Sequence, residues 1–366
     1  MKSSRQQLLV LLGVLSGAQA FTGPQSVMTA SPFVRTTGSA LKMSKETDME
    51  RESDENKSLH ETYSLDLSKT IYTSSMKSPK DAYVAFAEKG AANAKMAKRK
   101  IFHQAVLGGC YVGFGGLLSL SIAGNIGGIG GANPGLEKMA FAALFPVNLL
   151  LIATTGGQLF TGNTATVAAA RFEELVDNRE LIRNWIVSLA GNVVGCSIMA
   201  YAAWYAGCLT GGTADLAMKT AVGKVGATFG KNFVKAILCN WMVSIAVFLA
   251  GASNDLVGKL VGVWFPISTF VAIGLEHSVA NLFIMPAAML LKAQLTWGDI
   301  MFRNVIPVLL GNAVAGAIVV AASYSYQFGR LGGKRRAIFA EQLAQYEKRK
   351  MLLKNKIESL REGQTA

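Results

Sequence analysis

One motif occurs twice in this chain, and the duplication constrains the fold more than any other feature. Each copy has a Phe-Pro pair, a glycine, a Gln or Glu, an asparagine, and then Arg-Asn and Gly-Asn pairs. The first copy is Phe145-Pro146, Gly156-x-Gln158-x4-Asn163 and Arg183-Asn184-x6-Gly191-Asn192. The second is Phe265-Pro266, Gly274-x-Glu276-x4-Asn281 and Arg303-Asn304-x6-Gly311-Asn312. The offset is 118 to 120 residues throughout, so a unit of about this length is repeated.

The repeated unit predicts an inverted arrangement in a membrane. Each copy contains about three apolar stretches near the ~20 residues that cross a bilayer, so consecutive copies enter it from opposite sides. The middle stretch of each copy is interrupted by glycines and polar residues, as discontinuous membrane helices are. We predict an all-α integral membrane protein whose six transmembrane helices form two inverted three-helix repeats, with broken second and fifth helices. The predicted spans are 103–126, 139–174 (broken near 154–163), 182–209, 232–251, 258–292 (broken near 274–281) and 301–328.

Composition agrees with a membrane protein rather than a soluble enzyme. Apolar residues make up 51% of the 366 positions and charged residues 16%. The net charge of +13 comes largely from basic residues beside the spans, at 95–100 and 330–336. Such flanks favour the cytosol-like side of a membrane and show no nucleic-acid-reading motif. We expect lipid around the spans, both termini on one side, and no nucleic-acid partner.

The first 43 residues predict a two-part targeting address. Residues 1–20 place basic residues before an apolar run and end in Ala18-Gln19-Ala20, as a cleaved signal peptide does. Residues 21–43 start with Phe21, contain no acidic residue and are rich in Ser and Thr, as transit peptides are. This order resembles the presequence of algae whose plastids lie inside extra membranes. A plain secretory signal with an extracellular tail is the alternative.

Three further segments flank the repeats. Residues 44–77, acidic at first and without periodicity, are predicted to be a disordered linker. Residues 78–100 are predicted to form a helix along the membrane surface. The basic tail 329–366 has apolar residues at 4–3 spacing over three heptads. A short coiled coil and a solvated amphipathic helix are equally consistent with that spacing.

The second break contains the residues with the clearest chemical potential. His277 is the one histidine in the interior of a predicted span, since His103 lies at the basic edge of the first, and Glu276 precedes His277. An ionisable side chain at membrane depth is costly, so it indicates a polar path, and histidine can move a proton near neutral pH. The alternative is that His277 is only a hydrogen-bonded residue of the protein core. Thr161, in the first break, should face His277, and half-helix N-termini there favour a small anion.

Residues before the breaks and beside the fourth span complete the candidate site. Lys224 lies at a predicted mouth, where it either raises the local concentration of anions or is a solvated loop lysine. Phe145, Leu149 and Phe270 precede the breaks, where bulky apolar groups can narrow a pore and exclude hydrated ions. Taken alone, such residues more often face lipid or the core.

Five strings together resemble the formate/nitrite transporter family across about residues 78–328. They are Asn133-Pro134-Gly135, Phe145-Pro146-x12-Leu159-Phe160-Thr161-Gly162-Asn163, Asn240-Trp241-Met242-Val243, Gly274-Leu275-Glu276-His277-Ser278-Val279-Ala280-Asn281 and Gly311-Asn312. The resemblance implies an aquaporin-like six-helix protomer, a homopentamer with one pore in each protomer, and transport of small monovalent anions such as formate, nitrite, hydrosulfide or lactate.

The resemblance also implies roles for individual residues. Substrate-pore candidates are His277 at the centre, Thr161 beside it, Lys224 in a vestibule, and Glu276, Asn281, Asn240 and Asn312 nearby. Constriction candidates are Leu149, Phe160 and Phe270, with Phe145 and Leu159 in the same shell. Gln158 stands where the family commonly has an acidic residue, so any charge pairing made there is absent or rearranged.

Family and address together predict proton-coupled import of nitrite across the inner envelope of a plastid. Formate, lactate or another small monocarboxylate is the alternative substrate, and no residue selects among them. A neutral-solute channel is a weaker rival because both breaks lack Asn-Pro-Ala motifs. An enzyme is disfavoured because no nucleophile motif, metal-ligand cluster or nucleotide loop accompanies Glu276 and His277. We expect no metal and no cofactor.

Overall fold

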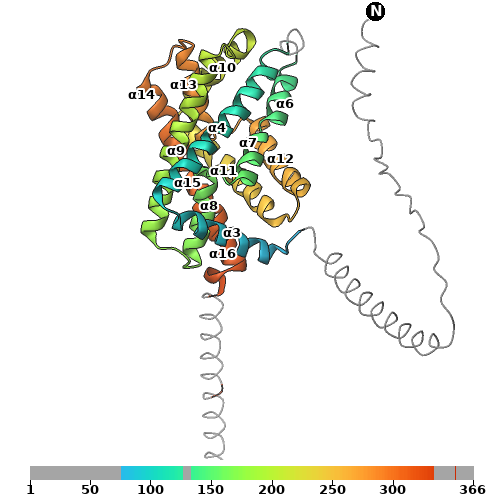
Figure 1. Cartoon of the computed structure of the whole chain (residues 1–366), viewed down its shortest axis with the longest axis vertical. Helices are drawn as coiled ribbons and strands as arrows, with labels where there is room; N and C mark the ends of the chain where they lie inside the picture. The colour runs from blue at the N-terminus through green and yellow to red at the C-terminus, as the bar shows by residue number, and fades with distance from the viewer. Residues whose placement is uncertain (1–75, 127–132, 334–350, 352–366) are drawn as a thin grey trace, which may run out of the picture. The chain divides into compact units, whose positions relative to one another are not determined.

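The computed structural model describes residues 76–126, 133–333 and 351 of the chain (Figure 1). The targeting address, most of the predicted linker and the heptad tail lie outside these residues. The described part is almost entirely helical and contains six stretches long and apolar enough to cross a membrane. They are Lys98–Ala123, Pro134–Thr155, Asn178–Tyr205, Phe229–Ala252, Leu256–Ile273 and Trp297–Phe328. The predicted fold class is therefore confirmed, with span boundaries shifted by a few residues.

The second and fifth spans are broken at equivalent places. The second consists of α6 (Pro134–Leu144), α7 (Val147–Thr155) and, after the break, α8 (Phe160–Phe172). The fifth consists of α12 (Leu256–Ile273) and α13 (Ser278–Leu290). The first half of each ends at a glycine, Gly156 or Gly274, with φ of 83°. Glycine alone adopts this left-handed conformation without steric cost, which explains why both breaks begin there.

Four spans remain: α4 (Lys98–Ala123), α9 (Asn178–Tyr205), α11 (Phe229–Ala252) and an irregular sixth span. The sixth alternates between helix types: α14 (Trp297–Asp299), the π-helix η1 (Ile300–Val305), α15 (Ile306–Val314), the π-helix η2 (Ala315–Ala322) and α16 (Ser323–Phe328). The wide π turns are a departure from the regular span that was predicted. Such turns are rare and often accompany functional sites.

Each repeat also contains a short helix that does not span the membrane. In the first repeat this is α3 (Pro79–Lys95), which starts at the N-cap Ser78, packs against α8 and ends before α4. In the second it is α10 (Gly211–Val225), which packs against α13. The α3 helix was predicted, although to about residue 100. The α10 helix was not, so Lys224 lies on a helix and not in a loop.

A short strap fixes the start of the described chain. Met76 pairs with Ser253 as an isolated β-bridge, and the backbone nitrogen of Lys77 donates to the Ala252 carbonyl at 2.9 Å. The Lys77 ammonium donates to the Gly251 carbonyl at 2.9 Å and to Asn254 Oδ1 at 2.8 Å. Residues 76 and 77, which were predicted to belong to the disordered linker, instead contact the end of α11.

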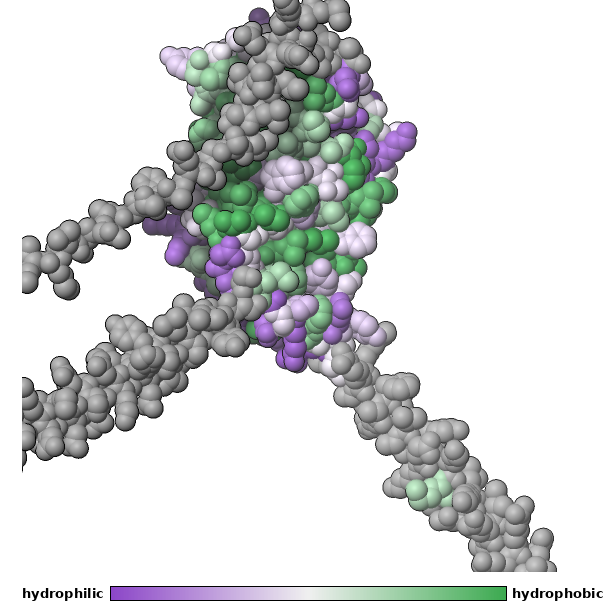
Figure 2. All heavy atoms as spheres, turned by 90° about the vertical axis from the view of Figure 1, so that its right-hand side faces the viewer, coloured by the Kyte–Doolittle hydropathy of each residue, from purple (hydrophilic) through white to green (hydrophobic). Residues whose placement is uncertain are grey.

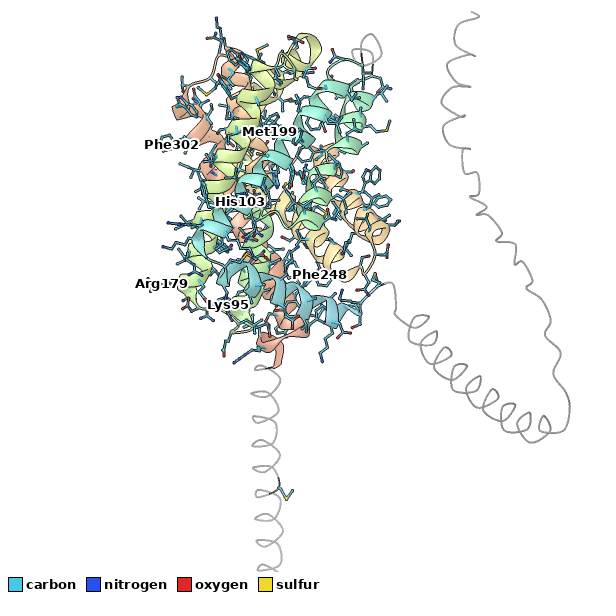
Figure 3. All side chains as sticks on the ribbon, viewed as in Figure 1. Lys95, His103, Arg179, Met199, Phe248 and Phe302 are labelled. Atoms are coloured by element: carbon cyan, nitrogen blue, oxygen red, sulfur yellow. The ribbon has the colours of Figure 1, made fainter. Side chains whose placement is uncertain are left out.

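The two ends of the bundle have different elements. In Figure 1, α3 and α16 lie at the lower end, and α10 and α14 lie at the upper end. Lys95 marks the lower end in Figure 3, and Phe302 lies nearer the upper end. On the face seen in Figure 2, apolar residues form a zone at mid-height, with hydrophilic residues towards the two ends. The start of α3 and the end of α16 thus share one side, as six crossings require.

Candidate pore and its two mouths

The two breaks meet through a direct contact between their side chains. His277 Nε2 lies 3.0 Å from Thr161 Oγ1, and the two side chains are 5% and 0% exposed. His277 Nδ1 accepts from the backbone nitrogen of Ala280 at 3.0 Å and so caps the N-terminus of α13. Because Nδ1 is an acceptor, Nε2 carries the proton and donates to Thr161. The imidazole in this arrangement is neutral.

Matching asparagines brace both breaks from the neighbouring helices. Asn192 Oδ1 accepts from the Phe160 nitrogen at 2.8 Å, and its amide donates to the carbonyls of Ala105 and Gln158 at 2.8 and 2.9 Å. Asn312 repeats the pattern in the second repeat. Its Oδ1 accepts from the Ser278 nitrogen at 2.9 Å, and its amide donates to the carbonyls of Ala236 and Glu276 at 2.8 and 3.2 Å. These bonds satisfy break-loop groups that no helix pairs internally.

The polar cluster behind the second break is charged. The Glu276 carboxylate is 2% exposed and accepts from the side-chain amides of Asn281 and Asn304 at 2.8 and 3.1 Å. Lys224 Nζ lies 3.1 Å from the same oxygen, Oε2, in an ion pair whose side chains are 16% and 3% exposed. The η1 segment supplies Asn304, so the irregular sixth span contributes directly to this cluster.

The equivalent cluster behind the first break is neutral. Gln158 Oε1 accepts from the side-chain amides of Asn163 and Asn184 at 2.9 and 3.1 Å, as Glu276 does from its two asparagines. Glu276 is paired with the ammonium of Lys224. At the equivalent place in the first break, Gln158 Nε2 donates to Gln104 Oε1 at 3.0 Å and approaches Met96 Sδ at 3.6 Å. An amide thus takes the place of a carboxylate and its lysine partner.

A cavity of about 220 Å³, here called the α10 cavity, leads from α10 to His277. Lys224, Phe145, Phe270 and His277 are among its lining residues. The rings of Phe145 and Phe270 meet edge to face with centroids 6.4 Å apart. Phe270 stacks on His277 with ring centroids 5.7 Å apart, so Phe270 lies directly beside the imidazole and Phe145 lies behind it. The α10 mouth is the opening of this cavity.

A much smaller cavity of about 20 Å³, the α3 cavity, lies on the other side of the breaks. Leu149, Leu159 and Gly162 line its inner part, and Lys89 and Asn93 of α3 line the α3 mouth. A space of this size holds about one water molecule. Lys89 is solvent-exposed, yet protein surrounds it on most sides. Burial, and secondarily the charge of Lys259, lower the pKa of Lys89.

The structure brings most of the predicted site residues together around the two breaks. Two groups differ from a simple lining role. Phe160 packs against Trp185 with ring centroids 6.4 Å apart. Asn240 directs its amide to the Thr161 carbonyl, Thr164 Oγ1 and the Asn312 carbonyl at 3.2, 2.9 and 2.7 Å, so Asn240 and Asn312 act as braces here.

Several contributing residues were absent from the predicted site. Asn184, Asn192 and Asn304 belong to the duplicated motif, so their recurrence was a usable signal. Lys89 and Asn93 lie on a surface helix and carried no such signal. Within the described ranges 76–126, 133–333 and 351, no group of three or more His, Cys, Asp or Glu is placed to hold a metal ion.

An all-helical multi-pass membrane protein whose two half-helix breaks meet between two cavities is a channel or transporter by its architecture. The family model named formate/nitrite transporter matches residues 80–326. The chain belongs to the formate/nitrite transporter family, which confirms the resemblance found in the sequence. Its members are transporters or channels rather than enzymes.

Named relatives and solved structures agree with this assignment. A probable formate transporter of Methanothermobacter thermautotrophicus is 40% identical over 275 residues, covering 70% of this chain and 98% of that protein. Formate-nitrite transporter 3 of Toxoplasma gondii is 36% identical over 258 residues, covering 68% and 51%. A pentameric formate channel with formate bound superposes with a TM-score of 0.57 at 25% identity, covering 64% of this chain and 98% of that one.

Proposed function

We propose that the chain transports small monovalent anions of weak acids along a path from the α10 cavity, past His277 and Thr161, into the α3 cavity. The observation that carries the proposal is the 3.0 Å contact between these two side chains at the meeting point of the breaks. Buried polar groups at membrane depth are expensive unless they serve a polar path. The flanking cavities give such a path an entrance on each side.

The lining explains why a weak-acid anion is the favoured class. Beside Phe145 and Phe270 an ion loses much of its water, which costs several kcal/mol for a small charged group. Desolvation raises the pKa of an acid, so the anion binds a proton there more readily than in water. The neutral acid then passes at lower cost. Anions of strong acids have no such route.

The hydrogen bonds of His277 refine how a proton takes part. The sequence suggested proton transfer from or through His277. With Nδ1 engaged by Ala280, the neutral imidazole instead presents its Nε2–H and the Thr161 hydroxyl as donors to a passing oxygen atom. The neutralising proton comes from the loading side, where the anion and a proton combine to the acid. Flux should therefore rise as the pH on that side falls.

Nitrite entering a plastid is our preferred physiological substrate, with formate or lactate as alternatives. Support for the plastid comes from the predicted address in residues 1–43, and support for formate comes from relatives named as formate transporters and channels. A solved relative titled a pentameric formate channel supports a homopentamer of this chain in the lipid bilayer. Each protomer contains its own complete path, so assembly is not needed to form the site.

The test is uptake of nitrite, formate, lactate and glycerol into proteoliposomes containing the full chain, at several external pH values. We expect saturable anion uptake that rises with acidity. His277→Phe removes both the donor and the cap, and should lower anion flux at least about tenfold, the loss typical of one hydrogen bond to a charged group.

His277→Asn is the matched variant, because an asparagine caps a helix and still offers an N–H donor. We expect it to retain a larger share of the acid-dependent flux than His277→Phe. Unchanged flux in His277→Phe would falsify the role of the histidine. Uptake of glycerol without anions would instead replace the proposal with a neutral-solute channel.

A further inference from the structure

The α3 mouth has a lysine whose charge is not neutralised. No carboxylate lines the α3 cavity among the residues described, and its polar lining consists of Lys89, Asn93, Asn163 and Thr166. Lys89 makes no hydrogen bond or ion pair with any other residue in the described part of the chain. At the α10 mouth, by contrast, Lys224 is paired with Glu276 at 3.1 Å. The mouths therefore differ in net charge.

The inner end of the α3 cavity is also favourable to an anion. Leu159, the N-cap residue of α8, and Gly162, in the first turn of α8, line it, and Leu159 supplies no side-chain cap. An uncapped helix N-terminus carries a partial positive charge. The equivalent end of α13 is capped by His277. Asn192 and Asn312 each accept one hydrogen bond at these two ends, so the α8 end has one side-chain acceptor fewer than the α13 end.

A second cation strengthens the field at this mouth. Lys259, in the first turn of α12, interacts electrostatically with Lys89 and contributes to lowering its pKa. The acid at the start of α12, Asp255, is engaged in capping, since its Oδ1 accepts from the Gly258 nitrogen at 2.7 Å. Two like charges that interact in this way are stabilised by an anion that binds both.

We propose that Lys89, supported by Lys259 and the N-terminus of α8, forms an oxyanion site at the α3 mouth. A monovalent oxyanion bound there is on the transport path, a role that rests on the proposed function. A divalent oxyanion binds more strongly because two lysines attract it. It remains at the mouth, because one proton does not neutralise its two charges and losing its water beside the apolar lining is therefore too costly, and so it blocks the path.

The test is formate flux in proteoliposomes of the full chain with sodium sulfate on both faces, at ionic strength held constant with sodium gluconate. Sulfate is the probe because its charge does not change over the working pH. The half-inhibitory sulfate concentration should rise about threefold to fivefold in Lys89→Gln, the range of an exposed ion pair. Lys89→Arg keeps the charge and should stay within about twofold of the parent chain.

Lys95→Gln is the matched control, since it removes the same charge from the same helix without changing the α3 cavity. Equal inhibition of the parent and Lys89→Gln, or an equal shift in Lys95→Gln, overturns the site. If the chain carries no formate, the proposed function fails, and sulfate is then titrated against the thermal unfolding of the detergent-solubilised protein. A stabilisation that Lys89→Gln does not reduce also overturns the site.

Discussion

The two breaks share a backbone and differ in charge. Both begin at a glycine with φ of 83°. At each break one asparagine of a neighbouring helix makes three hydrogen bonds. Two side-chain amides donate to residue 158 at the first break and to residue 276 at the second. Only the second includes a carboxylate and a lysine. The shared part holds irregular backbone inside a membrane, where every polar group must be paired. The charged part is free to differ, because either an amide or an ion pair satisfies the same asparagines.

Removing the charge at the second break gives the largest effect expected from this comparison. Glu276→Ala leaves Lys224, Asn281 and Asn304 without their shared acceptor, which should cost about 3–5 kcal/mol of unfolding free energy. The midpoint of thermal unfolding in detergent should fall by on the order of 10 °C.

Glu276→Gln is the control, because it gives the second break the side chain already present at the first. It should lose clearly less stability than Glu276→Ala, since an amide oxygen still accepts from both asparagines and Lys224 can turn to water. Equal losses in the two variants would show that the ion pair, and not the acceptor, holds the cluster.

Gly90 of α3 and Gly223 of α10 differ in how closely they are packed, and alanine substitution should reveal the difference. A Cβ on Gly90 of α3 would overlap the carbonyl group of Thr166 in α8. Overpacking of this kind costs about 1–3 kcal/mol. Gly223 of α10 has no atom within 4 Å of an added Cβ, so Gly223→Ala should be neutral or stabilise by up to about 1 kcal/mol. The midpoints of thermal unfolding of both variants measure the difference. Equal midpoints would contradict the closer packing at Gly90.

A charge placed at the first break should have an effect that depends on pH. Gln158→Glu keeps the acceptor for Asn163 and Asn184 but loses the donor to Gln104, at a cost of about 1–3 kcal/mol near neutral pH. A buried carboxyl without a partner has a raised pKa when folded, so the folded state binds the proton more tightly. Lost stability should return as pH falls through that pKa. Thermal midpoints measured from pH 8 to pH 5 check this, and a midpoint difference that does not narrow would show that the pKa of the new carboxyl is not raised.

The breaks and spans were predictable because their signals are local. Glycines and polar residues inside an apolar run indicate a broken helix wherever they occur, and the repeat doubled the evidence. Helix α10 lacked such a signal, since Gly211-Gly212 and the mixed sequence after it are typical of a loop. Its helical state depends on packing against α13, a tertiary effect. The π turns of the sixth span likewise reflect contacts, as Asn304 shows.

The site was predictable in its members and less so in their roles. Pseudo-symmetry placed Thr161 opposite His277, and the structure joins them at 3.0 Å. The capping role of His277 Nδ1 depends on a distance to Ala280 that composition does not specify. Lys89 was missed because only the packing of α3 on α8 decides that this lysine, among the several on the helix, borders a cavity.

The strap at Met76 and Lys77 can form only late in the synthesis of the protein, because its partners lie about 175 residues further along the chain. Lys77 is 174 residues from Gly251, and a ribosome adding 5–20 residues per second needs on the order of ten to thirty-five seconds to cover that interval. During this time four spans are synthesised while the strap has no partner. Residues 76 and 77, the first that the structure describes, are therefore among the last to reach their final positions, because their contacts form only after the end of the fourth span has been synthesised.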